Sequence, residues 1–368
     1  MKKHHLVLFC LLLFSLNQIV HATDWKKIAL KDASQDRISV IFEGYSPDKL
    51  ACDTTTRMMP NKSWVTVMLG GGDREPLFKN RIYISRSQNQ GYRWSPMKPV
   101  NLGVKDRALV PTELMVYKGI STLAVSTHNG KFDEWKSWFA KSKNSCRSFG
   151  PLKPLPGVLK DRTFLRNHIV SRDGKIIMPF QHYVDRPGPV NPRNGVIISK
   201  DEGKTWTVHG WIKTSPKDQF RMWAENNIVE LEDGTISMLI RGEKGFLYRA
   251  DSKDGGLTWP EMAVITDIQN PNSKITMYSL GGDRVAILMN SSSKNRRPLS
   301  LWISFDGMKT WPYQRVLVKE TFDREGGGRL SYPDGFVDSK KEYLNFAYDD
   351  NRHRAIFYGA RLPVLTNK

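Results

Sequence analysis

A carboxylate and an arginine stand 16 residues apart in the segment WAENNIVELEDGTISMLIRG, where Glu225 precedes one apolar run and Arg241 ends the next. The turn residues Asp233 and Gly234 separate the two runs, which indicates two antiparallel strands joined by a tight turn. Such a hairpin would bring the carboxylate of Glu225 and the guanidinium of Arg241 to the same end. The pair could combine acid–base chemistry with anion binding, or it could be an ordinary salt bridge at a strand end.

The elements that would position this hairpin repeat along the chain. A motif of the form Ser-x-Asp-x-Gly-x-x-Trp occurs in five intact or degenerate copies: SQNQGYRW from Ser87, SKNSCRSF from Ser142, SKDEGKTW from Ser199, SKDGGLTW from Ser252 and SFDGMKTW from Ser304. Successive copies start 55, 57, 53 and 52 residues apart. A nearly constant period of this length indicates one supersecondary unit that is used repeatedly.

The motif has the chemistry of a hairpin turn. Its Ser and Asp side chains can bond to nearby backbone groups, and its Gly supplies a left-handed backbone position. The Trp can then pack into the core beside the next strand. We therefore expect the aspartates of the repeats to be structural.

The repeat resembles the Asp-box, or bacterial neuraminidase repeat, of the sialidase superfamily, over roughly residues 45–362. This resemblance implies an all-β fold, a six-bladed β-propeller with four antiparallel strands in each blade. Six strand–turn–strand segments along the chain agree with six blades. A strand around residues 28–42 is expected to close the sixth blade, because ring closure removes free sheet edges. We expect residues 23–368 to form this one propeller.

The resemblance also implies roles for particular residues. Glu225 looks like the base that activates a tyrosine, and Arg241 and Arg296 look like two members of the arginine triad that holds the substrate carboxylate. Tyr332 follows Trp311 by 21 residues, which is similar to the place of the tyrosine nucleophile. A neutral phenol suits a sugar with a carboxylate on its anomeric carbon, because a carboxylate nucleophile would be repelled. The alternatives are a basic loop at Arg296 and a core tyrosine at Tyr332.

Two family features are less clear in this chain. The glycine-rich segment LGGGDREP places Asp73 and Glu75 on a loop at a blade end, and the resemblance favours Asp73 as the acid/base residue with Glu75 as its rival. Cys52 and Asp53 stand where the first triad arginine is expected, and Arg57 follows only a few residues later. The chain therefore looks closer to divergent BNR repeat-like proteins than to a standard sialidase.

Histidines in the second and third blades suggest a different chemistry. His168 is predicted to start an inner strand and His182 to end the next, which would place both near Glu225, while His128 has the equivalent place in the second blade. Together with Tyr332 and arginines, such histidines would suit a polysaccharide lyase, since arginine neutralises a uronate while His or Tyr removes the proton α to it. Otherwise each histidine is a satisfied strand-end residue.

The N-terminus predicts export. Residues 1–22 resemble a secretory signal peptide, with two lysines, an apolar run over 6–16 and the sequence VHA before Thr23. The apolar run is too short to span a bilayer comfortably, so no membrane span is expected. A secreted or periplasmic location follows. Cys52 and Cys146 then remain, either as one disulfide or as two unpaired core cysteines.

The charge balance limits the partners. With 56 Lys and Arg against 37 Asp and Glu, the formal net charge is +19, which favours anionic partners such as acidic glycans. Nucleic acid is not expected, because no binding motif is present, and neither a cofactor nor a metal is expected. The oligomeric state stays open.

The function expected from these observations is an exo-sialidase-like glycoside hydrolase, secreted, that acts on a terminal acidic sugar of a glycan. Two alternatives remain: a uronate-directed polysaccharide lyase or hydrolase that uses histidine, and a non-catalytic glycan-binding propeller.

Overall fold

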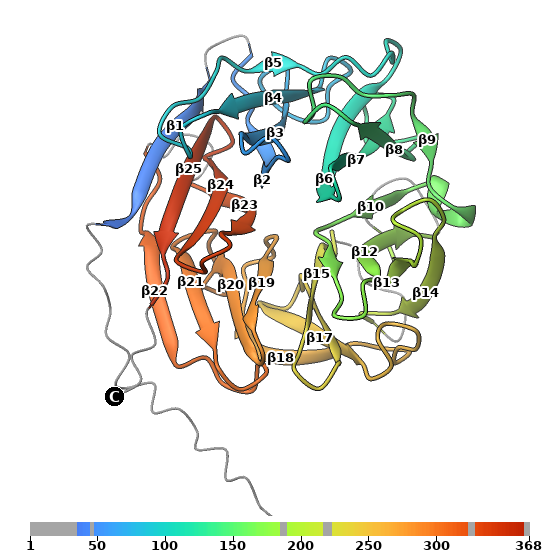
Figure 1. The fold of residues 1–368 in the computed structure, drawn as a ribbon, viewed down its shortest axis with the longest axis vertical. Coiled ribbons are helices and arrows are strands. Elements are labelled where there is room, and N and C mark those ends of the chain that lie inside the picture. The colour runs from blue at the N-terminus through green and yellow to red at the C-terminus, as the bar shows by residue number, and fades with distance from the viewer. Residues whose placement is uncertain (1–34, 45–47, 185–189, 216–222, 323–327, 364–368) are drawn as a thin grey trace, which may run out of the picture.

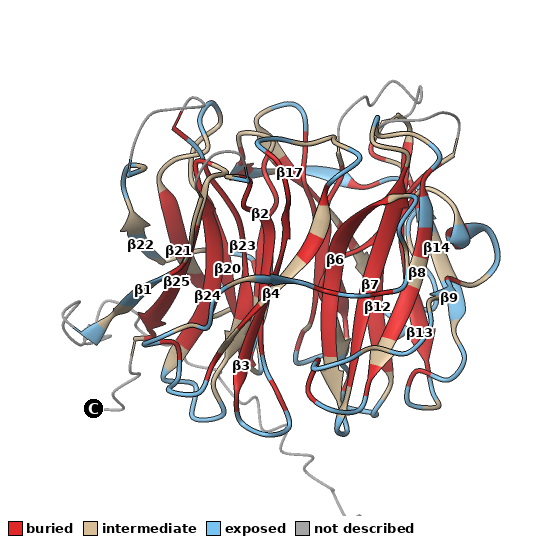
Figure 2. Cartoon of the chain, turned by 90° about the horizontal axis from the view of Figure 1, so that it is seen from above, coloured by how far each residue is buried: buried red, intermediate tan, exposed pale blue. Residues whose placement is uncertain are grey.

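A computed structural model describes residues 35–44, 48–184, 190–215, 223–322 and 328–363. Six antiparallel sheets are arranged in a ring around one axis (Figure 1), which confirms the predicted all-β, six-bladed propeller. The strands are buried along most of their length, whereas exposed residues gather at the turns and on the outermost strands (Figure 2).

The first three blades, each given from its innermost strand outward, consist of β2 (Cys52–Met58), β3 (Trp64–Gly70), β4 (Arg81–Ser87) and β5 (Lys98–Pro99); β6 (Ala108–Tyr117), β7 (Ile120–His128), β8 (Lys136–Ser142) and β9 (Lys153–Pro154); and β10 (Thr163–Leu165) with β11 (Ile169–Val170), β12 (Ile176–Tyr183), β13 (Pro192–Ser199) and β14 (Thr207–Ile212). A short 3-10 turn, η3 (Gly157–Lys160), lies between the second and third blades.

The last three blades consist of β15 (Asn226–Glu230), β16 (Ile236–Ile240), β17 (Phe246–Ser252) and β18 (Val264–Gln269); β19 (Thr276–Gly281), β20 (Arg284–Asn290), β21 (Leu299–Ser304) and β22 (Tyr313–Val318); and β23 (Leu330–Val337), β24 (Tyr343–Asp350), β25 (Arg354–Arg361) and β1 (Arg37–Glu43). The N-terminal strand β1 pairs with β25, so the ring is closed as predicted. Residues 28–34 of the predicted closing strand lie outside the described residues, and β1 starts at Arg37.

All five repeat motifs form the same turn after the third strand of a blade. In each copy the serine Oγ accepts a hydrogen bond from the backbone N–H of the fifth motif residue at 2.8–2.9 Å. The same Oγ donates to the Asp or Asn Oδ1 at 2.8–2.9 Å. The fifth residue has a positive φ even where Cys146 (61°) or Met308 (68°) replaces Gly. The turn geometry is therefore set by the serine and acidic or amide side chains as well as by glycine.

The motif tryptophans join neighbouring blades. Trp206 of the third blade stacks on Phe139 of the second, with ring centroids 5.6 Å apart, and Trp94 of the first packs 5.7 Å from Phe357 of the sixth. Trp259 covers Gly210, where an added Cβ would come within 2.9 Å of the indole ring. Trp206 and Trp259 are only half-buried, so they seal the outer seams between blades rather than filling the blade cores.

The possible disulfide between Cys52 and Cys146 is absent, because both cysteines are free. Cys52 begins the inner strand of the first blade, whereas Cys146 lies in an outer turn of the second blade. The Sγ of Cys146 instead contacts the Sδ of Met59 at 3.6 Å.

The predicted signal peptide, residues 1–22, lies outside the described residues. Within the described part of the chain, no helix is long and apolar enough to cross a membrane.

Candidate active site

The hairpin of the fourth blade brings Glu225 and Arg241 together. Glu225 directly precedes β15 and Arg241 directly follows β16, and the backbone N–H of Arg241 donates to the carbonyl oxygen of Glu225 at 2.9 Å. Nη1 of Arg241 donates to both carboxylate oxygens of Glu225 at 2.8 Å. Both side chains are buried. The pair sits at one end of the inner strand, as the hairpin predicted.

Tyr332 approaches the same carboxylate from the sixth blade. Its hydroxyl donates to Oε1 of Glu225 at 3.3 Å. Tyr332 lies on the inner strand β23 at a register shift between Ser331 and Asp334, and its φ is +51°. A left-handed backbone is uncommon for an aromatic residue and is held only where the surroundings impose it. The bulge therefore aims the phenol at Glu225.

The surroundings set opposite protonation states for these two groups. Burial opposes ionisation of Glu225, but Arg241 and Arg166 outweigh it and hold the pKa of Glu225 below its usual value. Burial and the charge of Glu225 raise the pKa of Tyr332 well above its usual value. Glu225 is therefore an ionised acceptor beside a neutral phenol, which is the arrangement of a base with its proton donor.

Arg296 borders the same group from the fifth blade. Its guanidinium carbon lies 5.8 Å from the centre of the Tyr332 ring, and its Nη2 donates to the carbonyl oxygen of Asn272 at 2.9 Å. The side chain of Asn272 in turn accepts a hydrogen bond from Nε of Arg241. The structure thus brings together Glu225, Arg241, Arg296 and Tyr332, which the sequence places in three different blades.

A cavity of about 30 Å³, called here the Glu225 cavity, lies at this cluster. It is lined by Asp53, Glu75, Val110, Phe132, Trp135, Phe164, Arg166, Trp223, Glu225 and Tyr332. Part of the lining is an aromatic wall that consists of Phe132, Trp135, Phe164 and Trp223, whose neighbouring rings lie between 4.8 and 6.3 Å apart. The lining also includes three carboxylates and Arg166, so the cavity combines apolar and ionic surfaces.

The loop after β3 brings Glu75, and not Asp73, to the Glu225 cavity. The side chain of Asp73 is half exposed and lies 3.8 Å from Arg74. The side chain of Glu75 is only 15% exposed, lines the cavity and forms an ion pair with Arg352. Burial raises the pKa of Glu75, and Asp53 adds to this effect while Arg352 opposes it. Of the two acids considered from the sequence, only Glu75 lines the same cavity as Tyr332.

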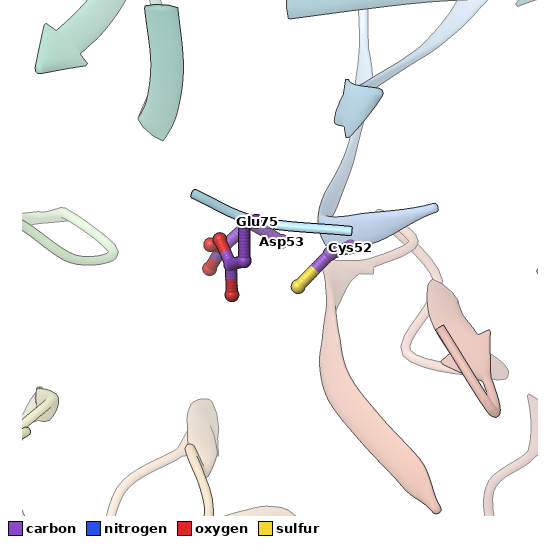
Figure 3. Close-up of side chains that lie close together, drawn as sticks. All are labelled: Cys52, Asp53 and Glu75. Atoms are coloured by element: carbon purple, nitrogen blue, oxygen red, sulfur yellow. The ribbon is translucent and has the colours of Figure 1, made fainter. Parts of the chain in front are cut away.

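Cys52, Asp53 and Glu75 form a compact group whose ligand-type atoms all lie within 4.8 Å of one another (Figure 3). Such a group could in principle hold a metal ion. However, the Oδ1 of Asp53 already accepts a bond from Arg166 at 3.0 Å, and Glu75 is paired with Arg352. Burial also raises the pKa of the Cys52 thiol, so the thiol is protonated in the metal-free protein. The residues present therefore fit acid–base chemistry better than metal binding.

Arg57 does not replace the missing first arginine. It points to a second cavity of about 530 Å³, whose lining includes Arg57, His168 and Asp334 and which is called here the Arg57 cavity. Arg57 is paired with Glu113 at 2.7 Å and with Asp334 at 2.8 Å, so its charge is used within this buried network. At the Glu225 cavity the aligned position carries Asp53, which reverses the expected charge.

The three histidines do not meet at the Glu225 cavity. His168 lines the Arg57 cavity, where its Nδ1 lies 2.9 Å from Oε1 of Glu113. His182 is buried against Thr163, 2.8 Å away, and His128 packs on the aromatic wall. Burial lowers the pKa of His128 and of His182 to about 4, with nearby arginines adding to the shift. The predicted position of His168 beside Glu225 is therefore wrong. His182 does lie near the end of β12, opposite the first residue of the inner strand, but it does not line the Glu225 cavity.

The error arises from the inner strand of the third blade, which starts earlier than the sequence suggested. Thr163 pairs with His182 at the beginning of β10, and Ile169 pairs with Ile177 in β11. The break between these two short strands sends Arg166 to the Glu225 cavity and His168 to the Arg57 cavity. Sequence reasoning missed Arg166, although it stands two residues before His168 in the segment RNHIVS.

Comparison with known proteins agrees with this architecture. A sialidase from Bacteroides fragilis (strain YCH46) is 25% identical over 208 residues, which cover 54% of this chain and 35% of that enzyme. The chain thus spans about a third of this relative. Among solved structures, the Hadza microbial sialidase Hz136 superposes with a TM-score of 0.67 at 19% identity, covering 85% of this chain and 66% of that one.

The NanB sialidase from Streptococcus pneumoniae, solved in complex with 2-[(3-chlorobenzyl)ammonio]ethanesulfonate, gives a TM-score of 0.67 at 15% identity, covering 93% of this chain and 73% of that one. At these identities the structural matches establish the fold alone. The sequence pattern of the BNR repeat-like domain matches residues 68–343, which is most of the chain. The protein therefore belongs to the BNR repeat-like domain family.

Proposed function

We propose that the protein is a secreted exo-acting glycoside hydrolase that removes a terminal acidic sugar, of the sialic acid type, from a glycan. The observation that carries this proposal is the contact of Tyr332 with Glu225 at 3.3 Å, beside Arg241 and Arg296. The similarity to a Bacteroides fragilis enzyme and to a solved structure that are both named sialidases supports the same class of reaction.

The first step uses the neutral phenol as nucleophile. The Oη of Tyr332 attacks the anomeric carbon while its proton passes to the ionised carboxylate of Glu225, and the glycosidic C–O bond breaks. Because the pKa of Tyr332 is raised and that of Glu225 is lowered, the proton leaves the phenol only as the new bond forms. The product of this step is a sugar bound covalently to tyrosine.

Glu75 supplies the proton that the leaving oxygen needs. Its raised pKa keeps a larger share of the carboxyl group protonated, as a general acid requires. In the second step the Glu75 carboxylate takes a proton from water, and the water oxygen attacks the anomeric carbon. The bond between that carbon and Oη of Tyr332 breaks, and Glu225 returns its proton to the phenolate oxygen. Two displacements at one carbon give net retention of configuration.

The non-catalytic alternative gains support from the size of the Glu225 cavity. A volume of about 30 Å³ has room for a few water molecules but not for a sugar ring. A sugar ring therefore needs the aromatic wall to move, or it binds above the cavity with its anomeric end toward Tyr332. The alternative of a uronate lyase that uses histidine loses its support. That alternative needs the histidines at one site, whereas His128, His168 and His182 lie in three separate environments.

The test is to incubate the full chain with sialylated glycans, uronate polysaccharides and neutral glycans, and to identify the released products by liquid chromatography and mass spectrometry. Free sialic acid supports the proposal. Unsaturated uronates that absorb in the ultraviolet would establish the lyase, and saturable binding without any product would establish the binding module. Turnover should also fall as salt is added, because the recognition is ionic.

A further inference from the structure

A third cavity, of about 500 Å³, lies on the outer seam between the second and third blades and is called here the Trp206 cavity. Phe139 of β8 and Trp206 of the third repeat motif give it an aromatic surface, with stacked rings 5.6 Å apart. Three lysines, Lys141, Lys153 and Lys204, line the same cavity. None of these residues lines the Glu225 cavity, so the proposed hydrolysis does not use them.

The Trp206 cavity lies at the end of the propeller away from the Glu225 cavity. In the second blade, Val110 near the start of β6 lines the Glu225 cavity, whereas Val116 near the end of β6 lines the Arg57 cavity. Ser142, the last residue of β8, lies level with Val116 because both pair with Ser121. A ligand beside the neighbouring Lys141 therefore leaves the Glu225 cavity open.

The indole N–H of Trp206 differs from that of two other repeats. Nε1 of Trp94 and Nε1 of Trp259 each donate to the carbonyl oxygen of the glycine in their own motif, at 3.1 and 2.8 Å. In the third blade the equivalent carbonyl oxygen, that of Gly203, accepts a hydrogen bond from Nζ of Lys141 at 2.8 Å instead. Within the described ranges of the chain, Nε1 of Trp206 has no hydrogen-bond partner. This donor can therefore bind a ligand in the cavity.

The lysines gather positive charge without a matching carboxylate. Burial lowers the pKa of Lys141, and the charges of Lys153 and Lys204 lower it further, while Asp201 opposes them. The carboxylate of Asp201 is bonded inside its own turn, where it accepts from the hydroxyl of Thr205 at 2.6 Å. No carboxylate of a described residue forms an ion pair with any of the three lysines. Lys153 and Lys204 are exposed, so an anion can reach them.

An acidic saccharide fits this combination of groups. The C–H face of a sugar ring can pack on an indole, its hydroxyl groups can accept from the indole N–H, and its acidic group can bind lysine. A volume of about 500 Å³ lies within the range of small-ligand sites. Single-stranded nucleic acid also combines charge with stacking, but its successive bases need successive exposed rings. Here the two rings stack on each other and Phe139 is buried.

We propose that the Trp206 cavity is a second binding site, specific for acidic saccharides and separate from the Glu225 cavity. The choice of a saccharide among possible anions rests on the proposed function of the chain. Lys153 and Lys204 bind the acidic group, and Trp206 contacts the sugar ring. Binding at this site holds the protein on an acidic glycan and raises the local concentration of chain ends for the Glu225 cavity.

The experiment measures by calorimetry the affinity of the full chain for four probes. A hyaluronan oligosaccharide carries carboxylates, a dextran sulfate oligosaccharide carries sulfates, and a dextran oligosaccharide is neutral; a single-stranded oligothymidylate is the fourth probe. None of them carries sialic acid, so binding does not depend on the proposed hydrolysis. The variants are Trp206→Phe, which removes the indole N–H, and the double variant Lys153→Gln with Lys204→Gln.

Lys309→Gln is the matched control. Lys309 has the position in the fifth motif that Lys204 has in the third, and both lysines are exposed. Their backbone N–H groups make the same bond, at 3.1 Å, to the aspartate of the motif. Lys309 does not line the Trp206 cavity.

The double variant should lose about ten-fold or more in affinity for an acidic saccharide, the fold-change of one charge-assisted hydrogen bond. Trp206→Phe should lose about three-fold or more, whereas Lys309→Gln should stay within about two-fold of the wild type. Tighter binding of the hyaluronan or of the dextran sulfate probe would identify the acidic group as a carboxylate or a sulfate. Hydrolysis of an aryl sialoside should be unchanged in the double variant, because the Glu225 cavity is intact.

Four results would overturn the inference. The wild type could bind neither acidic saccharide, or the neutral dextran as tightly as the acidic ones. Lys309→Gln could lose as much affinity as the double variant, which would show attraction to the basic surface as a whole. Trp206→Phe could lose no affinity, which would place the site elsewhere. The oligothymidylate could bind more tightly than both acidic saccharides, which would assign the cavity to nucleic acid. A chain that binds as expected but hydrolyses no sialoside would keep this inference and end the proposed function.

Discussion

Replacing Tyr332 by Phe removes one oxygen atom and separates chemistry from binding. The lost hydrogen bond to Glu225 is long, at 3.3 Å, and Glu225 keeps its two 2.8 Å bonds to Arg241. The free energy of unfolding should therefore fall by less than about 1.5 kcal/mol. Turnover should fall by about 10³-fold or more, because the phenol oxygen is the proposed nucleophile and phenylalanine has no atom that replaces it.

The assay combines steady-state hydrolysis of an aryl sialoside with calorimetric binding of free sialic acid. Affinity should stay within about two-fold of the wild type, since the phenol oxygen contributes little to ground-state binding. Glu225→Gln should lower turnover by a similar factor, and the double variant should be no worse than either single one, because both residues serve one step.

Tyr278→Phe is the matched control for this prediction. Tyr278 lines the Arg57 cavity, and its hydroxyl accepts a hydrogen bond from the backbone N–H of Gly335 at 2.8 Å. Its loss should cost a comparable amount of stability and leave turnover intact. The reasoning is refuted if Tyr332→Phe keeps turnover within about ten-fold of the wild type, or if Tyr278→Phe lowers turnover equally.

Three further predictions concern acid–base chemistry and stability. Glu75→Gln should lower turnover by about 10²-fold or more. It should also remove the fall in activity on the alkaline side of the pH–rate profile, because that fall reports loss of the proton from the acid. An unchanged alkaline limb would exclude Glu75 as the general acid. Burial raises the pKa of Asp349 to about 7, whereas the unfolded chain releases this proton near the ordinary pKa of about 4. The free energy of unfolding of the wild type should therefore fall relative to that of Asp349→Asn as pH rises from about 4 to 7. Thermal melts in which the difference between the two proteins does not change with pH would contradict this. Trp206→Ala should lower the free energy of unfolding by about 2–3 kcal/mol in urea titrations. The expected loss is smaller than for a core tryptophan because Trp206 is half-buried. A change under about 0.5 kcal/mol would mean that the stacking of Trp206 on Phe139 does not stabilise the contact between the blades.

The repeats made the fold predictable from the sequence, because each motif carries its own local turn. The serine and acidic or amide side chains complete the same hydrogen bonds in all five copies, so the blade count follows from spacing. The contact of Glu225 with Arg241 was predictable for a similar reason, since one hairpin fixes both ends. Tyr332 and Arg296 join them because equivalent blade positions converge on one axis.

The rest of the site depends on irregular backbone that periodicity does not encode. The loop after β3 turns Glu75 inward and Asp73 outward, and nothing in the order of residues distinguishes them. The break between β10 and β11 separates Arg166 from His168, although a continuous strand was expected. Arg352 reaches the cluster through a turn in which Asn351 and Arg352 both have left-handed φ angles of 59° and 62°.

The central claim is that Tyr332 forms the covalent bond to the sugar, and trapping that bond tests it most directly. A 2,3-difluoro sialic acid carries a good leaving group, and its second fluorine slows the hydrolysis of the intermediate. After brief incubation and proteolysis, mass spectrometry should locate one fluorinated sugar on the peptide that contains Tyr332, with none on Tyr332→Phe. A sugar attached to Glu225 or to Glu75 instead, or free fluoride released by the wild type at the same rate as by Tyr332→Phe, would contradict the account.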